Sequence, residues 1–164
     1  MLELLADPTV AVELREVESV NREGAERFLE KQASVALFAP KTCVDLAVER
    51  SEDGKLIGLV SVVSNGHRQA EIGWAFHSEH RGQGYATEAA RGLLDLLFRT
   101  HGFHRVFAGT IYTNERSWKV MERLGMRKEA HFWKAHVPAE EGGEWIDTVR
   151  YGLLAEEWPT QEFG

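Results

Sequence analysis

The sequence lacks several features that each define a class of protein. It has one cysteine, Cys43, so no disulfide can form within the chain. No apolar run approaches the roughly 20 residues of a membrane-spanning helix, and the N-terminus lacks the basic segment that opens a signal peptide. The 19 basic and 26 acidic residues give a net charge of −7, which does not suit a general nucleic-acid binder. These absences predict a cytoplasmic protein with neither a membrane nor a nucleic acid as its partner.

Metal-binding spacings are also missing. The chain has seven histidines, but they are scattered, and no Cys-x-x-Cys or His-Glu-x-x-His pattern occurs. We therefore expect no metal site. Apolar residues make up 43% and charged residues 27% of the 164 residues, which is typical of a globular protein with its own core. We expect residues 1–164 to form a single domain.

The hydrophobic pattern predicts a series of strands and helices. Helical spacing covers Arg22 to Gln32, Tyr85 to Arg99 and Ser117 to Leu124. Strand-like runs cover Val44 to Glu49, Leu56 to Val63, Ala70 to Phe76, Val106 to Ile111, Ala130 to Val137 and Ile146 to Leu154. Asn65-Gly66 is typical of a tight hairpin turn between two of the strands. This order predicts an α/β protein with a mixed sheet.

The most informative segment is Arg81-Gly82-Gln83-Gly84-Tyr85-Ala86, between a predicted strand and a predicted helix. Glycines let the backbone approach a ligand closely, and the first N–H groups of a helix attract an anion. Arg81 can add a charged fork to a phosphate oxygen. The segment therefore predicts a phosphate site, although a plain glycine loop remains the alternative. A nucleotide triphosphatase loop is excluded because no Gly-Lys-Ser/Thr ending follows, and the three-glycine dinucleotide fingerprint is incomplete.

A second segment, Asn114-Glu115-Arg116-Ser117, directly follows a predicted strand. Asn and Ser are preferred helix caps, so the simplest interpretation is local hydrogen bonding at the start of a helix. The same side chains would also stand at the end of a strand, facing a ligand in an opening of the sheet. The two interpretations are compatible.

These segments together carry a family resemblance. Arg81-x-x-Gly84-x-Ala86 opens the helix, Ala70-Glu71-Ile72-Gly73-Trp74 precedes it, and Asn114-x-x-Ser117-x-x-Val120-x-x-x-Leu124-Gly125-Met126 follows it. With the endings Glu144-Trp145-Ile146-Asp147 and Glu157-Trp158, the pattern resembles the GCN5-related N-acetyltransferase (GNAT) superfamily, in its RimJ/RimL-type branch of ribosomal-protein alanine N-acetyltransferases. The resemblance implies the GNAT fold, a mixed and mostly antiparallel sheet with a splayed parallel pair at its centre, flanked by helices.

The resemblance also implies an acetyl-coenzyme A site. The strand end near Trp74 would pair with the pantetheine arm, the glycine segment would hold the pyrophosphate, and Asn114 and Ser117 would lie near the pantetheine and the thioester. The cofactor-binding residues implied are Trp74, Ala75, Phe76, Arg81, Gly82, Gln83, Gly84, Tyr85, Ala86, Thr87, Asn114 and Ser117. Many family members place a proton-donating tyrosine one turn after Ser117, but this chain has Met121 there.

The catalytic candidates are Ser117, Asn114, His136 and Glu71. Without the tyrosine, Ser117 or a water is left to protonate the departing thiolate. A general base must deprotonate an amine whose pKa is near 8 for an α-amino group. His136 on a late strand and Glu71 on the cofactor strand are the candidates, and an ordinary exposed or structural role remains the alternative for both.

The start of the chain departs from the family pattern. Family members usually begin with a strand, which is either missing here or replaced by Val10 to Val17. A missing edge strand would leave backbone groups unpaired, and a homodimer could cover them.

Two functions follow from these observations. The first is an acetyl-coenzyme A dependent N-acetyltransferase that moves the acetyl group to a primary amine by direct attack in a ternary complex. The acceptor would be a protein N-terminal α-amine or a small-molecule amine. The alternative is a non-catalytic module that binds or senses coenzyme A.

Overall fold

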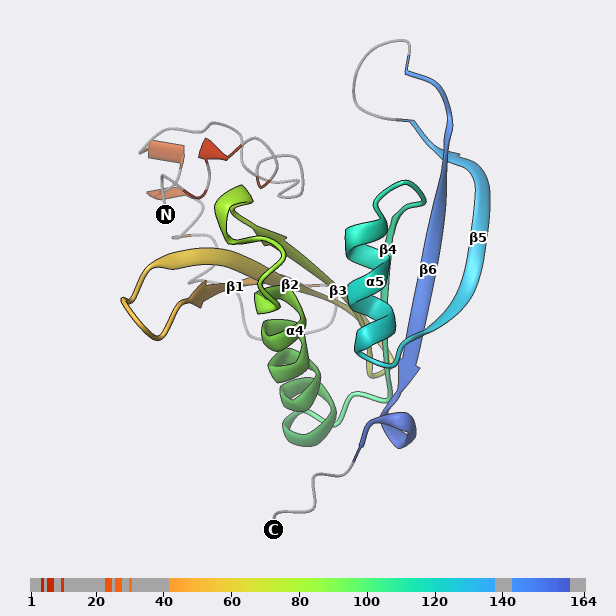
Figure 1. Ribbon diagram of the computed structural model, residues 1–164. Helices are drawn as coiled ribbons and strands as arrows, with labels where there is room; N and C mark the ends of the chain where they lie inside the picture. Colours follow the sequence, from red (N-terminus) through yellow and green to blue (C-terminus); the bar gives the residue numbers. More distant parts are fainter. Residues whose placement is uncertain are drawn as a thin grey trace.

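The computed structural model describes most of the chain from residue 42 onward and a part of the N-terminal region (Figure 1). The described residues are Leu4, Ala6, Asp7, Val10, Glu23, Gly24, Glu26, Arg27, Glu30, 42–137 and 143–159. Within the helix expected over Arg22 to Gln32, the described positions have helical backbone, and the other positions lie outside the described residues. Val10 is also helical, whereas positions 11–17 of the possible first strand lie outside them.

Six strands form one sheet within the described residues, in the order β1-β2-β3-β4-β6-β5. The strands are β1 (Cys43–Glu49), β2 (Leu56–Gly66), β3 (Gln69–Phe76), β4 (Arg105–Ile111), β5 (Arg127–His136) and β6 (Ile146–Leu154). The helices that follow β3 and β4 are α4 (Tyr85–Asp95) and α5 (Glu115–Arg123). The predicted mixed α/β sheet is confirmed, and each strand overlaps its predicted range.

The central strands β3 and β4 run parallel, while every other neighbouring pair among these six strands is antiparallel. β3 and β4 pair only from Gln69↔Arg105 to Glu71↔Phe107. Beyond this point each strand continues along its outer neighbour, β2 or β6, but the two no longer pair with each other. We call this opening, between Ile72–Phe76 and Ala108–Ile111, the splay. The splayed parallel pair expected at the centre of the sheet is therefore confirmed.

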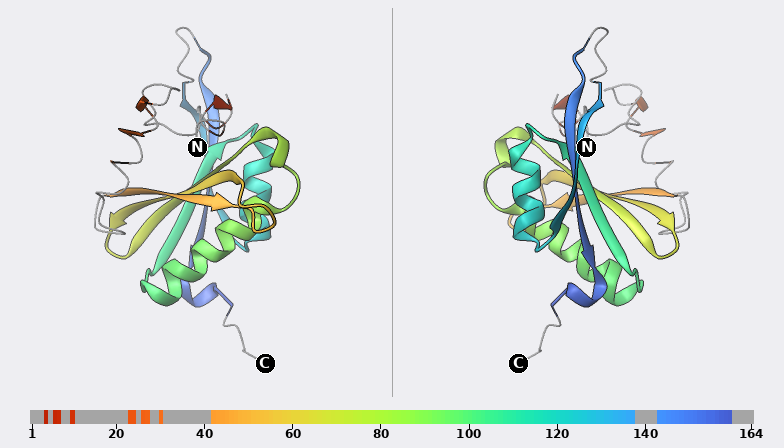
Figure 2. Two further views of the ribbon diagram at one scale, coloured as in Figure 1. Left: turned by 90° about the vertical axis from the view of Figure 1, so that its left-hand side faces the viewer. Right: turned by 90° about the vertical axis from the view of Figure 1, so that its right-hand side faces the viewer.

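The helices α4 and α5 cover one face of the sheet, which we call the helix face (Figure 2). Strand residues that alternate toward this face pack with apolar residues of both helices, as the pleat of a strand requires. The core between the layers includes Val62, Ile72, Val106, Ala108, Val149, Tyr151, Leu93, Leu94, Leu97, Val120 and Met121.

The opposite face of the sheet, the rear face, carries Glu71, Gly73 and Ala75 of β3, as the alternation predicts. Leu4 and Val10 of the N-terminal region bury Leu59 and Ala75 on this side. The rear face is therefore covered by apolar residues near β2 and the end of β3.

One local prediction was wrong, and one predicted helix changes type within its range. The hairpin between β2 and β3 turns at His67 and Arg68, which have φ of 50° and 59°, and Asn65-Gly66 belongs to the end of β2. Tertiary contacts hold this turn, because Arg68 donates from Nε to the Gly102 carbonyl (2.6 Å) and its own carbonyl accepts from the His104 N–H. The helix expected to run to Arg99 is α-helical only to Asp95 and continues as a wider π-helical segment, Leu96–Thr100.

Candidate functional site

A cleft of about 510 Å³ lies on the helix face, where the splay meets the starts of α4 and α5. It joins the glycine segment and the Asn114–Ser117 segment, which are far apart in the sequence. The residues that line it are Trp74, Phe76, Ser78, His80, Arg81, Gly82, Gly84, Tyr85, Ala86, Thr87, Asn114, Arg116, Ser117, Lys119, Val120 and Arg123. Its volume is typical of pockets that hold small-molecule ligands or cofactors.

The glycine segment forms the entrance to α4. Gly84 is the N-cap residue, with a φ of 91°, and no side chain caps the helix. Gly82 also has a positive φ of 74°, so both positions favour glycine. Because a helix cannot satisfy its own first N–H groups, those of Tyr85 and the next residues are available to an anion in the cleft.

Arg81 ties this entrance to the end of β3. Its Nε donates to the Phe76 carbonyl at 2.9 Å, and both residues line the cleft. The loop before α4 is also fixed from the N-terminal region, because the buried Asp7 carboxylate accepts from the Ser78 N–H at 2.8 Å. The loop that leads into α4 is thus held on two sides.

His80 is the buried polar residue of the cleft. The residue is 8% exposed, and its Nε2 has no hydrogen-bond partner within the described residues. Burial lowers the pKa of His80, and the nearby positive charges of Lys55 and Arg50 lower it further. The imidazole therefore lines the cleft in its neutral form at neutral pH.

Asn114 and Ser117 form a connected pair at the start of α5. Asn114 caps the helix, since its Oδ1 accepts from the Ser117 N–H at 3.3 Å. Its Nδ2 donates to Ser117 Oγ at 3.1 Å and to Thr110 Oγ1 at 3.2 Å. Because Asn114 supplies a donor to Ser117 Oγ, the hydroxyl proton of Ser117 remains available for a group in the cleft. Asn114 therefore caps the helix, and both Asn114 and Ser117 line the cleft, as the two compatible interpretations of this segment predicted.

A row of basic side chains completes the cleft. Arg116, Lys119 and Arg123 line it from α5, at the three- and four-residue spacings that place side chains on one helix face. None of the described residues that line the cleft is acidic, although the whole chain has a net charge of −7. The cleft is therefore a local cationic site suited to a ligand with several phosphate charges.

Most of the predicted cofactor residues meet in this cleft, but two do not. Ala75 faces the rear side with Leu4 and Val10, and Gln83 donates from its side-chain amide to the Glu79 carbonyl at 3.2 Å. Neither residue lines the cleft.

The catalytic candidates separate in space. Ser117 and Asn114 line the cleft, whereas Glu71 lies on the rear face at the last β3–β4 pair. His136 is an exposed residue at the end of β5 and does not line the cleft. Met121 is 1% exposed in the core, so it has no access to a ligand.

The sequence interpretation missed Ser78, His80, Arg116, Lys119, Val120 and Arg123 as cleft residues. The basic spacing of Arg116, Lys119 and Arg123 was a readable signal for part of this set, because it marks one face of a predicted helix. No pattern pointed to His80, whose importance depends on burial.

Asp147 and Trp158, from the two C-terminal sequence motifs, stabilise the fold outside the cleft. Asp147 accepts hydrogen bonds from the Lys134 N–H and from His131 Nε2, both at 2.8 Å. These two hydrogen bonds keep the pKa of the Asp147 carboxyl below its usual value. Trp158 donates to Asp95 at 2.8 Å and packs beside Phe98. These contacts join β5 to β6 and the end of the chain to α4.

Two further features are absent from the residues that the structure describes. No helix among them is long and apolar enough to cross a membrane. No cluster of three or more His, Cys, Asp or Glu residues among them could hold a metal ion.

The splay, the glycine entrance and the cationic cleft lie together on the helix face of one α/β fold. The chain matches the family described as "Acetyltransferase (GNAT) domain" over residues 1–127, and it belongs to this family. The family predicted from the sequence motifs is therefore confirmed.

Individual relatives agree with this assignment. The uncharacterized N-acetyltransferase YnaD of Bacillus subtilis (strain 168) is 38% identical over 109 residues, which are 66% of this chain and 62% of the relative. The ribosomal protein uS5-alanine N-acetyltransferase of Escherichia coli (strain K12) is 26% identical over 110 residues, 65% of this chain and 55% of the relative. The matches thus span little more than half of the length of these curated relatives.

Solved structures share the fold. An acetyltransferase of the GNAT family from Bacillus anthracis aligns with a TM-score of 0.77 and 28% identity, covering 96% of this chain and 88% of that one. A mutant spermidine N-acetyltransferase, SpeG, from Vibrio cholerae aligns with a TM-score of 0.70 and 23% identity, covering 85% and 77%. At that lower identity the likeness concerns the fold alone.

Proposed function

We propose that the protein is an acetyl-coenzyme A dependent N-acetyltransferase that moves the acetyl group to a primary amine by direct attack in a ternary complex. The observation that carries the proposal is the cationic cleft, which runs from the glycine entrance of α4 to Ser117 at the splay. Membership of the acetyltransferase family supports the same activity.

The donor would lie along the cleft. The edge of β3 that faces the splay, from Trp74 to Phe76, would pair with the pantetheine arm as an added strand does. The N–H groups at Gly84 to Thr87 would hold the pyrophosphate, and the basic row of α5 would neutralise the remaining phosphate charge. Coenzyme A fits this residue set because its phosphates are anionic and its pantetheine arm carries amide groups.

The reaction needs a neutral amine, a polarised carbonyl and a stabilised leaving group. The amine nitrogen attacks the thioester carbonyl, the new C–N bond forms, and the C–S bond breaks with its electrons going to sulfur. A backbone N–H of β3 at the splay would polarise the carbonyl without reorganisation. The amine loses one proton, to Glu71 or a water on the rear side, and the thiolate gains one.

Ser117 is the proposed proton donor or hydrogen-bond donor to the thiolate. Its Oγ accepts from Asn114 Nδ2 at 3.1 Å, and this contact leaves the Ser117 proton for the cleft. Since Met121 is buried and has no proton to give, no residue one turn later on α5 can take over this role.

Two measurements test the proposal. Isothermal titration should detect acetyl-coenzyme A binding at micromolar concentrations, and a thiol-reactive dye should detect coenzyme A release that depends on an added amine. Ser117→Ala should lower kcat by about 10²-fold while leaving the donor affinity within about twofold, because general acid catalysis contributes on that scale. No donor binding, or no release with any amine, would contradict the proposal.

A second variant, Asn114→Asp, separates the role of Asn114 in catalysis from its role as the helix cap. Aspartate caps a helix as well as asparagine does, so stability should change little. However, a carboxylate cannot donate to Ser117 Oγ and instead attracts the Ser117 proton. The variant should therefore lose kcat without losing stability, whereas equal kcat in Asn114→Asp and the unchanged protein would exclude the proposed role of this contact.

A non-catalytic module that binds coenzyme A is the second candidate, and the buried Met121 in place of the family tyrosine favours it. The two candidates differ in one result. A sensor binds acetyl-coenzyme A but releases no coenzyme A thiol with any amine, and Ser117→Ala leaves both the donor affinity and the absence of thiol release unchanged.

The acceptor is a protein N-terminal α-amine or a small-molecule amine. The relatives named above act on the alanine of ribosomal protein uS5 and on spermidine, as their names state. A cytoplasmic location, a homodimer, a single domain over residues 1–164 and a role of His136 as the base remain predictions.

A further inference from the structure

The rear face of the sheet gives access to the splay from the side opposite the donor cleft. Gly73 of β3 and Gly109 of β4 lie just past the last β3–β4 pair, and both alternate toward this face. A β-carbon at Gly73 would meet only Ser61 Cβ, at 3.9 Å, and Gly109 is exposed. The missing side chains of Gly73 and Gly109 therefore leave the rear face open beside the splay at these two positions.

An arginine lies beside this approach. Arg150 of β6 is the direct neighbour of Gly109 in the β4–β6 register. Its guanidinium carbon lies 4.9 Å from the centre of the Phe107 ring and 5.8 Å from that of Phe132. The two rings hold the planar group in place, which reduces the entropy lost when its N–H groups bind a partner.

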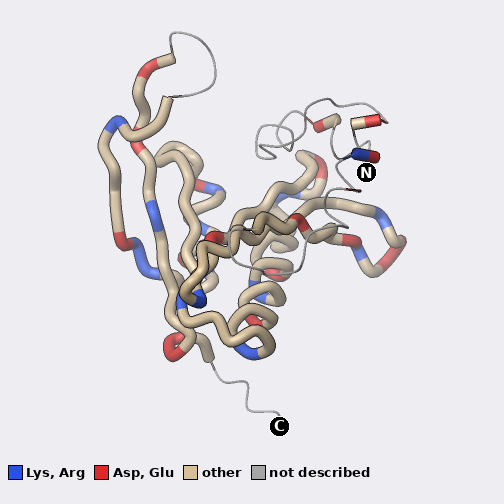
Figure 3. The backbone as a smooth tube through the Cα atoms, turned by 180° about the vertical axis from the view of Figure 1, so that it is seen from behind, with Lys and Arg blue, Asp and Glu red and all other residues tan. Residues whose placement is uncertain are grey.

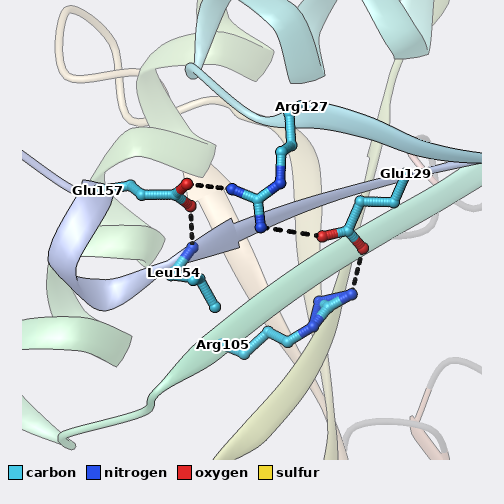
Figure 4. A network of polar contacts seen from close by, with 5 residues as sticks. All are labelled: Arg105, Arg127, Glu129, Leu154 and Glu157. Carbon is cyan, nitrogen blue, oxygen red and sulfur yellow. Dashed lines mark hydrogen bonds and ion pairs between the residues drawn. The ribbon is translucent and has the colours of Figure 1, made fainter.

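Arg150 also differs from the arginine next to it. Arg105 contacts the same Phe107 ring at 5.4 Å, but it is paired with Glu129, which in turn contacts Arg127 (Figure 4). Arg127 is paired with Glu157, so this network balances its own charges. Arg150 is exposed and has no carboxylate partner within the described part of the chain.

Within the described residues, Arg150 is a cation without a carboxylate partner among charged neighbours that are already paired. Arg127 and Glu129 belong to the balanced network, Asp147 is paired with His131, and Lys128 lies on the helix face. Seen from behind, the edge strands β5 and β6 carry both basic and acidic positions along one side of the sheet (Figure 3). A free carboxylate would be attracted to this edge, whereas a polycation would be repelled.

Glu71 provides the opposite charge on the other side of Phe107. It is the β3 partner of Phe107, two strands from Arg150 on the same face. Strands lie about 4.8 Å apart and rise about 3.3 Å per residue, so Glu71 and Arg150 are separated by roughly 10 Å across the sheet and, because their registers differ by two residues, by roughly 7 Å along it. This order of acid, ring and guanidinium complements an acceptor that carries an amine at one end and a carboxylate at the other.

We propose that Arg150, held between Phe107 and Phe132, binds a carboxylate of the acceptor, so the protein acetylates amines that carry an acidic group rather than polyamines. The inference rests on the proposed N-acetyltransferase activity and assigns the class of its acceptor. The guanidinium fork binds both carboxylate oxygens, which positions the amine at the splay near Glu71.

Thiol release with matched acceptors tests the inference. The probes are Ala-Glu amide, its neutral counterpart Ala-Gln amide, Ala-Gln with a free C-terminus, and spermidine. The acidic side chain of Ala-Glu amide should give a kcat/KM about tenfold or more above that of Ala-Gln amide, as one charge-assisted contact provides. A preference for Ala-Gln with a free C-terminus would instead assign the contact to a C-terminal carboxylate, which supports the same chemistry.

Variants of Arg150 test whether this residue binds the carboxylate of the acceptor. Arg150→Gln should raise the KM for the acidic acceptor about tenfold, with kcat and the KM for Ala-Gln amide within about twofold. Arg150→Lys keeps the charge but loses the fork, so it should recover only part of the affinity. The control Lys128→Gln removes the same charge from the helix face of β5 and should leave all acceptors unchanged.

The outcomes separate the inference from the function on which it rests. Release with every amine at equal efficiency, a preference for spermidine, or an equal effect of Arg150→Gln on acidic and neutral acceptors refutes the carboxylate site while the acetyltransferase activity stands. Absence of release with all four probes refutes both.

Discussion

Replacing Gly58 with alanine should disturb the fold and the donor cleft together. Gly58 lies on β2 opposite Phe76, whose ring lines the cleft. A β-carbon at Gly58 would stand 2.5 Å and 2.7 Å from the Phe76 ring carbons Cδ1 and Cε1, and 2.8 Å from the Ala75 carbonyl oxygen. Nonbonded carbons need about 3.5 Å or more, so the ring must move by about 1 Å. The carbonyl belongs to the backbone and cannot yield in the same way.

The expected size follows from this overlap. Overpacking in a core costs about 1–3 kcal/mol, and a domain of this size loses roughly 2–4 °C of Tm per kcal/mol. Thermal unfolding of Gly58→Ala should therefore show a Tm lower by about 2–12 °C. Because Phe76 also holds Arg81 through its carbonyl, titration should show an affinity for acetyl-coenzyme A that is about tenfold lower.

The control is Gly73→Ala on the neighbouring strand. Its β-carbon would meet Ser61 Cβ at 3.9 Å, an ordinary contact, so its Tm should stay within about 2 °C of the unchanged protein. If Gly58→Ala and Gly73→Ala have the same Tm and the same donor affinity, the close approach of Phe76 to Gly58 does not shape the cleft.

Two further predictions concern the loop that leads into α4. Gly84→Ala adds no clash, since nothing lies within 4 Å of its β-carbon, but its φ of 91° costs an alanine roughly 1–2 kcal/mol. Titration of Gly84→Ala should show an affinity for acetyl-coenzyme A at least about tenfold lower. The control is Gly92→Ala, a helix position with equal space, which should leave the affinity unchanged and raise the free energy of unfolding by up to about 1 kcal/mol. If Gly84→Ala and Gly92→Ala bind acetyl-coenzyme A equally well, phosphate binding at Gly84 is excluded. The lowered pKa of His80 means that the unfolded chain takes up its proton first as the pH falls below the usual value of 6.5, so acid lowers the free energy of unfolding. His80→Leu should therefore show a flatter fall of Tm from pH 7.5 to 5.5, and parallel profiles would show that His80 is not buried in its neutral form.

Much of the architecture followed from the sequence because local patterns decide it. Period-two alternation in Ala70 to Phe76 assigned Glu71 and Trp74 to opposite faces, and the structure has them there. The glycine segment predicted a helix entrance because glycine adopts the left-handed backbone of Gly82 and Gly84 at the lowest cost. Each of these properties depends on a few adjacent residues.

The errors arose where distant contacts outweigh local preference. Asn65-Gly66 is a strong hairpin signal, yet the chain turns at His67 and Arg68 because Arg68 is held by Gly102 and His104, more than 30 residues away. Likewise, the neutral state of His80 depends on burial and on Arg50 and Lys55 from another hairpin. A single-sequence pattern contains no information about such neighbours.

The sequence by itself determined the family, the order of the strands and helices, and most of the glycine-segment and Asn114–Ser117 residues that meet at the cleft. These features depend on hydrophobic period, glycine backbone freedom and helix capping, which act within one or two turns of chain. Only the tertiary structure decided that Ala75 and Gln83 do not line the cleft, that Met121 is buried, and that three basic residues of α5 line the cleft. It also brought Arg150 beside Gly109 and between two aromatic rings, because strand pairing joins residues about 40 positions apart that no local pattern relates.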